Sequence, residues 1–155
     1  MVLREAKPAS VGGMGSSIRP IALGLLRRRE QILVFEGHDD IKGETYYRPL
    51  GGGVEFGEHS EDALVREFRE ELDAEVVVKE RLGVLENVFT WRGNPGHEIA
   101  FVYEAAFVDA GIYARDEMKI LDDPATARWV DLQEFRDGSK ILYPHGLTEL
   151  LSTEQ

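Results

Sequence analysis

Apolar and polar residues alternate through the first third of the chain in a way that predicts short strands. Residues 18–27 are apolar at nearly every position, as expected for a strand buried on both faces at the centre of a sheet. A turn at 28–30 separates this strand from the apolar run 31–36, so the two are predicted to form a hairpin. Polar residues 37–44 predict a loop, and 46–48 predict a short strand that leads into three glycines.

The pattern then changes to a helical period. Ser60 is a suitable N-cap, and the acidic residues that follow it suit the first turn, so a helix is predicted from Ser60 to about Leu72. At ~100° per residue, one side of this helix collects the apolar residues and is predicted to face the core. Those residues are Leu64, Val65, Phe68 and Leu72.

The second half again favours strands, with short helices near the end. Residues 75–81 predict a strand that 82–91 either continue or follow as a separate strand. A turn at 92–96 predicts a hairpin around Asn94-Pro95-Gly96. The remaining predictions are a long strand at 97–108, an irregular acidic segment at 109–127, a strand at 128–132, a small helix at 132–135 and a closing helix at 144–152 that starts with proline.

The length of 155 residues suits one domain, which we assign to 18–155, preceded by a flexible N-terminal tail at 1–17. No run of 18 apolar residues is present, so no membrane span or membrane partner is predicted. The absence of cysteine excludes disulfides and thiol chemistry and fits a cytoplasmic location.

The net charge of −11 argues against nucleic acid as a partner, because nonspecific binding to nucleic acid needs a basic surface. A polyanionic substrate would need divalent cations and local arginines to reverse the field at its site. Whether the chain forms a homodimer is left open.

Candidate chemistry lies on the side of the predicted helix that carries Glu67, Glu70 and Glu71. These glutamates are neighbours at i, i+3 and i+4, and they are expected to be exposed opposite the apolar side. Clustered carboxylate oxygens suit Mg²⁺ or Mn²⁺, whereas a solvated acidic surface is the ordinary alternative. The glycines at 51–53 favour a site, because they let the backbone bend or approach a ligand closely.

This stretch resembles the Nudix box, G-x5-E-x7-R-E-U-x-E-E-x-G-U, in which U is a bulky aliphatic residue. Gly52 matches its first glycine, Glu58 its first glutamate, and the run 66–71 its central segment, so every charged position agrees. Four positions depart from the usual pattern: Leu50, Phe68, Asp73 and Ala74. Asp73 stands where glycine ends the helix, and aspartate tolerates the left-handed conformation better than most residues.

The resemblance implies a Nudix-type α/β/α sandwich with a mixed central sheet. It also implies metal-dependent hydrolysis of a phosphoanhydride bond in a nucleoside diphosphate linked to another moiety. Mg²⁺ or Mn²⁺ is then the expected cofactor. The implied ligands are Glu70, Glu71 and the carbonyl of Gly51, with Glu67 as a further ligand or the base, Arg66 orienting the carboxylates and Glu58 in support.

Outside the box, the resemblance suggests a further acid on a late loop, for which Asp123 is the first candidate. Its competitors are Asp122, Glu117 and Glu98. The nucleotide-derived substrate is expected to contact Tyr47, Arg48 and Trp91, with Phe89, Arg92 and His97 as further candidates. Core packing is the alternative role for Trp91 and Phe89, and a surface position is the alternative for His97.

Two other functions were considered. A non-catalytic Nudix-like domain that binds a nucleotide metabolite and regulates a partner usually lacks box carboxylates, which this chain keeps. An enzyme like isopentenyl-diphosphate isomerase needs a catalytic cysteine, and this chain has none.

Overall fold

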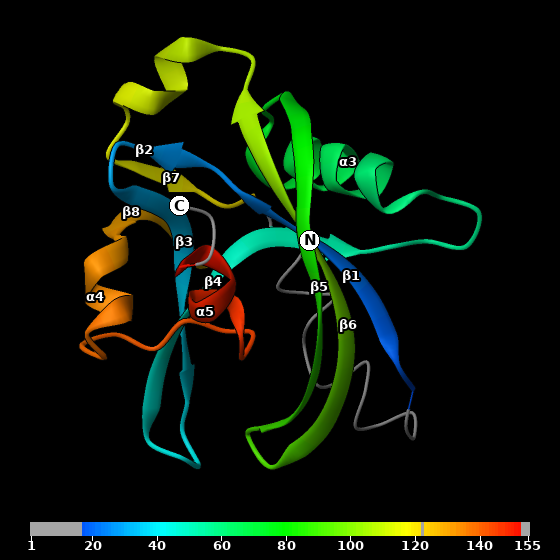
Figure 1. The fold of residues 1–155 in the computed structure, drawn as a ribbon, viewed down its shortest axis with the longest axis vertical. Coiled ribbons are helices and arrows are strands. Elements are labelled where there is room, and N and C mark those ends of the chain that lie inside the picture. Colours follow the sequence, from blue (N-terminus) through cyan, green and yellow to red (C-terminus); the bar gives the residue numbers. More distant parts are fainter. Residues whose placement is uncertain (1–16, 122, 153–155) are drawn as a thin grey trace.

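The computed structural model describes residues 17–121 and 123–152, so nearly all of the predicted tail lies outside the described residues. Within them the chain forms eight strands and four helical segments (Figure 1). The strands are β1 (Arg19–Leu25), β2 (Arg27–Arg28), β3 (Gln31–Asp39), β4 (Glu44–Gly53), β5 (Val76–Trp91), β6 (Asn94–Phe107), β7 (Glu117–Lys119) and β8 (Thr126–Asp131). The helices are α3 (Ser60–Leu72), α4 (Leu132–Arg136), α5 (Leu147–Ser152) and the 3₁₀ helix η1 (Ala110–Ala114).

One mixed sheet organises the fold, in the order β5-β6-β1-β4-β3-β8-β7, with β2 paired to β3. β1 runs parallel to β6 and antiparallel to β4. Ala22, Leu23 and Leu25 on β1 have no exposed surface, which confirms the prediction of a buried central strand.

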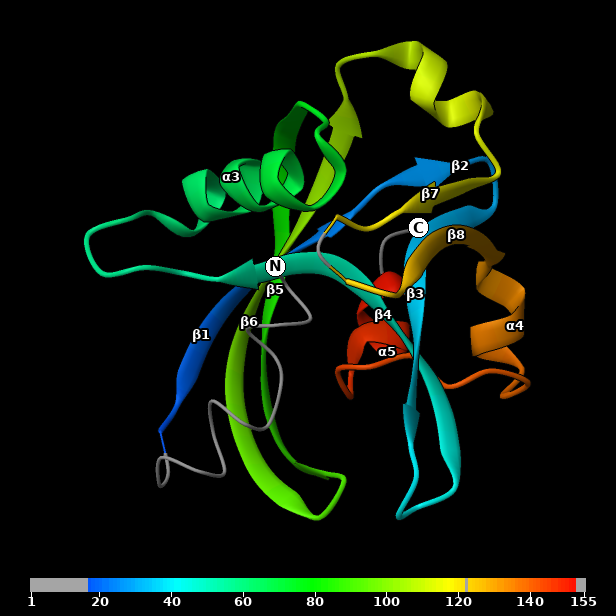
Figure 2. The same ribbon diagram turned by 180° about the vertical axis from the view of Figure 1, so that it is seen from behind.

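Helices cover both faces of this sheet. α3 lies in front of the sheet in Figure 2, whereas α5 lies in front of it in the opposite view of Figure 1. Phe68 of α3 belongs to one core cluster, and Leu147 of α5 and Phe135 of α4 belong to the other. The two clusters confirm the predicted α/β/α sandwich. None of the helices in residues 17–121 and 123–152 is long and apolar enough to cross a membrane.

The predicted hairpin between the first two apolar runs is wrong. Only β2 pairs with β3, with Arg27 opposite Ile32, while β1 leaves to pair with β4 and β6. A strand that is apolar on both faces gains most at the middle of the sheet, where it has a partner on each side. The turn at 29–30 therefore closes only a two-residue ladder.

The three glycines belong to β4 and do not form a bend after it. Gly51, Gly52 and Gly53 pair with Leu23, Ala22 and Ile21 of β1. Gly51 has φ 152°, and a Cβ at this position would lie 1.9 Å from the carbonyl oxygen of Ala22. Glycine is needed here because the two strands approach too closely for a side chain.

The ends of α3 agree with the sequence to within one residue. Asp73 adopts the expected left-handed conformation, with φ 52°, and its N–H donates to the carbonyl of Arg69 at 3.0 Å. The N-cap is His59 and not Ser60, whose hydroxyl shares a 2.5 Å hydrogen bond with Tyr103 Oη.

The turn between β5 and β6 lies within the predicted turn 92–96 but uses only its first two residues. Arg92 and Gly93 have φ 50° and 82°, the positive pair that a two-residue type I′ turn requires. Residues 94–96 are already paired in β6. β5 is one continuous strand with two register shifts. The predicted irregular segment 109–127 contains η1 and β7, and the closing helix starts at Leu147.

The β3–β4 and β5–β6 hairpins extend side by side from one end of the molecule (Figures 1 and 2). Asp39, which is 1% exposed, joins their tips. Its Oδ1 accepts N–H bonds from Ile41 and Lys42, at 3.0 and 3.1 Å, and its Oδ2 accepts one from Arg92 at 2.9 Å. Lys42 Nζ also donates to the carbonyl of Thr90 at 2.8 Å.

The hydrogen bond from the Arg92 N–H is the main cause that lowers the pKa of Asp39 below its ordinary 3.8. A lowered folded-state pKa adds stability that is present above 3.8 and is lost as the pH falls through the folded pKa. Asp39→Asn is therefore expected to lower the melting temperature at neutral pH, with a difference from wild type that shrinks in acid. Melting temperatures of both proteins across the pH range test this. Asp40→Asn, at an exposed neighbour, is the control, and a difference independent of pH would contradict the prediction.

Candidate functional site

The carboxylates of α3 are packed against the glycine segment of β4. Glu67 and Glu71 are each 2% exposed, which contradicts the predicted exposure of this side of the helix. Glu70 alone stays open, with 48% of its side chain exposed. Val65 and Leu72, predicted to face the core, are only partly buried.

Glu67 can be buried because the facing position of β4, Gly52, has no side chain. A Cβ on Gly52 would lie 2.4 Å from Cδ of Glu67, so the glutamate occupies the space that any other residue would fill. α3 can then pack close to the sheet with the Glu67 carboxylate between them. The glycine strand thus forms a cradle for the Glu67 carboxylate.

Gly52→Ala is expected to destabilise the protein by roughly 1–3 kcal/mol, because the new methyl group collides with the buried carboxylate. Chemical denaturation of four proteins tests this: wild type, Gly52→Ala, Glu67→Ala and the double variant. Glu67→Ala removes the obstacle, so the two changes together should cost less than their sum. Strict additivity would show that this contact does not set the spacing of helix and strand.

Arg66 ties the site together. Its guanidinium donates to both oxygens of Glu58, at 2.8 and 3.0 Å, to Glu67 Oε2 at 3.0 Å and to the carbonyl of Gly53 at 2.9 Å. A longer contact of 3.4 Å reaches Glu70 Oε1. One side chain therefore links the loop before α3, the end of β4 and two glutamates of the helix.

The surroundings of Glu58 and Glu67 shift their pKa values in opposite directions. The hydrogen bond from Arg66 lowers the pKa of Glu58, so this group stays ionised. Burial raises the pKa of Glu67, although the hydrogen bond from Arg66 opposes the rise. A carboxylate with a raised pKa is better suited to accept a proton near neutral pH.

The carboxylates do not converge on one point. Among residues 17–121 and 123–152, no group of three or more His, Cys, Asp or Glu side chains is gathered closely enough to hold a metal ion alone. Mg²⁺ is usually bound by one or two carboxylates together with substrate phosphates, so the donors present still fit such an ion. They are hard oxygen donors beside a cradle that a Cβ would fill. The role of the Gly51 carbonyl stays a prediction.

The late loop reaches the same helix. The N–H of Leu121 donates to the carbonyl of Glu71 at 2.8 Å, which holds this loop against α3. Asp123 on the loop is partly exposed, and its Oδ1 accepts the N–H of Ala125 at 2.9 Å. Of its competitors, Glu98 is buried in an ion pair with Arg48 and Glu117 is exposed, while Asp122 lies outside the described residues.

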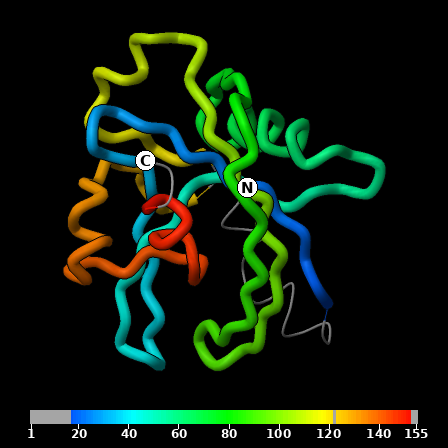
Figure 3. The backbone as a smooth tube through the Cα atoms, viewed as in Figure 1, coloured from blue at the N-terminus to red at the C-terminus, as the bar shows by residue number. Residues whose placement is uncertain are grey.

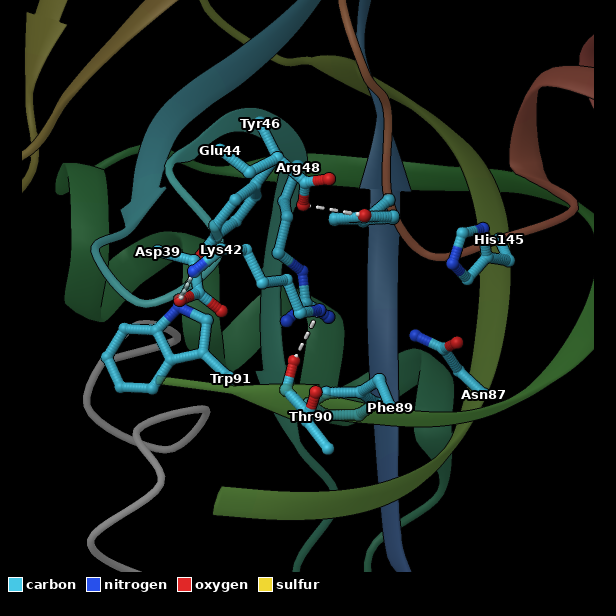
Figure 4. A pocket seen from close by; sticks show the side chains of 11 residues that line it. Asp39, Lys42, Glu44, Tyr46, Arg48, Asn87, Phe89, Thr90, Trp91 and His145 are labelled. Carbon is cyan, nitrogen blue, oxygen red and sulfur yellow. Dashed lines mark hydrogen bonds between the residues drawn. The ribbon is translucent and has the colours of Figure 1, made fainter. Parts of the chain in front are cut away.

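A cavity of about 390 Å³ lies between the two hairpins and the late loop. Its lining residues are Phe35, Glu36, Gly37, His38, Tyr46, Arg48, Phe89, Trp91, Arg92, Asp123, Pro124 and Ala125. A smaller neighbouring cavity, seen in Figure 4, shares Tyr46, Arg48, Phe89 and Trp91 with it. Five of the sequence candidates therefore line one cavity: Arg48, Phe89, Trp91, Arg92 and Asp123.

Tyr47 does not join them. It lies on the other face of β4, where its ring packs edge-on against Phe135 and its hydroxyl donates to Glu36 at 3.2 Å. Tyr46 takes its place in the cavity, and sequence reasoning missed it. Strand alternation counted back from Gly52 places Tyr46 and Arg48 on the glycine cradle's face, and this signal was available. His97 pairs with Glu86 away from the cavity lining.

Comparison with known proteins agrees with this geometry. Residues 18–147 match the NUDIX domain family, so the chain belongs to the Nudix family. Membership of this family supports hydrolase activity.

Solved structures share the fold at low identity. A MutT Nudix hydrolase from Burkholderia pseudomallei is 21% identical, with TM-score 0.61, over 90% of this chain and 100% of that one. The MutT protein from Methanosarcina mazei Go1 is 19% identical, with TM-score 0.62, over 87% and 91%. The ORF135 protein of E. coli is 21% identical, with TM-score 0.56, over 88% and 87%.

Proposed function

We propose that this protein is a metal-dependent pyrophosphohydrolase that cleaves a phosphoanhydride bond in a nucleoside diphosphate linked to another moiety. One observation carries the proposal. The box carboxylates are all retained, and Arg66 and the glycine strand hold Glu58 and Glu67 in a fixed arrangement, while the late loop that contacts Glu71 contributes Asp123 to a cavity of about 390 Å³.

Each residue has a role in this reaction. Glu70, Glu71 and the carbonyl of Gly51 would hold Mg²⁺ or Mn²⁺, with Asp123 as a further candidate ligand from the late loop. When bound, the cation neutralises the diphosphate and lowers the pKa of a water molecule. Glu67 serves as a further ligand or accepts the proton of the attacking water, which its raised pKa favours.

Arg66 acts on these groups and not on the substrate. By donating to Glu58 and Glu67 it fixes the direction of both carboxylates, and phosphoryl transfer depends mainly on such positioning and charge neutralisation. Arg48 and Trp91 provide contacts for the rest of the nucleotide, together with Tyr46. The absence of a nucleic-acid partner, the cytoplasmic location and a possible homodimer stay predictions from the sequence.

The alternative is a domain that binds a nucleotide metabolite without hydrolysing it. Such a domain has no need for box carboxylates, yet Glu67, Glu70 and Glu71 are present and Arg66 contacts two of them.

An activity screen with Mg²⁺ and with Mn²⁺ separates the two functions. The panel contains dinucleoside polyphosphates, nucleotide sugars, ADP-ribose and oxidised deoxynucleoside triphosphates, and the products are identified by mass. We expect cleavage of at least one compound into two phosphorylated products, abolished by a chelator. Binding without cleavage under both cations would favour the non-catalytic domain.

A further inference from the structure

Arg48 has a guanidinium donor that no described residue of the chain satisfies. Arg48 is 9% exposed, and its Nη2 donates to Glu98 Oε1 at 3.1 Å. Its Nε is buried and has no hydrogen-bond partner among the described parts of the chain. A buried guanidinium donor without an acceptor is costly, and Arg48 lines both adjoining cavities, where a ligand could offer an acceptor to its guanidinium group.

Glu98 determines which kind of acceptor fits. This carboxylate is 2% exposed and lies between Arg48 and Arg19, whose Nη1 is 3.4 Å from Glu98 Oε2. Glu98 serves both arginines, so the three groups together keep one positive charge, but Arg48 itself already lies against a buried carboxylate oxygen. A phosphate group at the same place would face that carboxylate, whereas a neutral carbonyl oxygen would not.

The surroundings of Arg48 suit a flat ring. Tyr46, Phe89 and Trp91, here called the aromatic wall, line both cavities beside it, and Figure 4 shows Arg48 reaching into the space that they border. Trp91 is fixed in place, because its Nε1 donates to Tyr46 Oη at 2.7 Å and the Arg92 guanidinium lies 4.3 Å from its ring centre.

We propose that Arg48 donates a hydrogen bond to a ring carbonyl of the substrate's base, which stacks on the aromatic wall. This inference deepens the proposed function and rests on it: the nucleoside diphosphate carries an oxo-base such as guanine, hypoxanthine or uracil in preference to adenine, which has no carbonyl. Arginine donates only, so at the exocyclic position of the base it pairs with an oxo oxygen, whereas adenine presents an amino group there. Glu98 is a positioning residue that acts through Arg48.

Inosine and adenosine monophosphate make a matched pair of probes, because they share ribose and phosphate and differ at the six-position edge of the base. Binding of each is measured by titration calorimetry without divalent cations, so no hydrolysis is needed. Wild-type protein is expected to bind the inosine nucleotide roughly tenfold or more tightly. Equal affinity, or preference for the adenosine nucleotide, overturns the proposal even if the hydrolase screen succeeds. The expected preference supports it even if that screen fails.

Two variants test whether Arg48 causes the preference for the inosine nucleotide. Arg48→Gln is expected to abolish it, since an amide can satisfy an amino edge as well, and Glu98→Gln is expected to weaken it by loosening Arg48. Arg92→Gln is the control. The Arg92 guanidinium stacks on Trp91 of the same aromatic wall, so its loss should weaken the binding of both nucleotides equally. Equal weakening of both nucleotides by Arg48→Gln, in a variant with a wild-type circular dichroism spectrum, would place Arg48 on ribose or phosphate and overturn the proposal.

Discussion

Glu70→Gln is expected to lower the Mg²⁺-dependent turnover by about 100-fold or more while leaving the melting temperature unchanged. Loss of a group that only supports a metal ligand costs ~10–100-fold, so loss of a ligand itself should cost at least as much. Stability should not suffer, because 48% of the Glu70 side chain is exposed and its contact with Arg66 is 3.4 Å long. Steady-state rates at saturating Mg²⁺ and thermal melting, measured on the same preparation, test both statements.

Glu71→Gln should give a similar loss of turnover, and here the 2% exposure of the side chain makes a folding control necessary. Glu61→Gln is the matched control, since Glu61 is an exposed glutamate in the first turn of the same helix. If either Glu70→Gln or Glu71→Gln kept the wild-type rate, that glutamate would not be a ligand.

Phe68→Ala is expected to destabilise the protein by roughly 3–5 kcal/mol, the cost of removing a large side chain from a packed core. Phe68 is 1% exposed, and its ring meets Phe107 edge-on at a centroid distance of 6.1 Å. A Cβ on Gly24 of β1 would lie 3.0 Å from the same ring, so little space is left for the neighbours to collapse. The free energy of unfolding in urea measures the loss.

Val65→Ala, three residues before Phe68 on the same helix, is the comparison. Val65 is only partly buried, so its truncation should cost clearly less than that of Phe68. Equal small effects of both substitutions would mean that this side of α3 is not packed against the sheet.

The sequence predicted α3, its left-handed end at Asp73 and the family, because each of these depends on residues close together in the chain. It failed for Glu67 and Glu71. A helical wheel gives the relative directions of side chains, but it does not show what lies opposite them. Here the opposing strand has glycine at position 52, so the Glu67 side chain fills a space that a side chain of the sheet normally occupies.

The cavity shows the same limit. Alternation along β4 places Tyr46 and Arg48 on the same face as Gly52 and Tyr47 on the other, but that this face meets Trp91 and Asp123 depends on distant parts of the chain. The contact of Arg92 with Asp39 is another case, because it joins two turns that no local pattern relates. The chemistry of the motif and several single residues of the cavity were predictable, whereas their meeting in one cavity was not.

The position of β1 affects how the protein can be made. The ribosome releases this strand early, yet Arg19 pairs with Glu98, which is synthesised 79 residues later. Until β6 has emerged, one edge of an apolar strand lacks its neighbour, even after β4 and α3 are complete. Nonlocal pairing of this kind slows folding and leaves the unfinished chain exposed to association with other chains. A nascent polypeptide stalled after α3 should therefore need chaperone protection that the finished one does not.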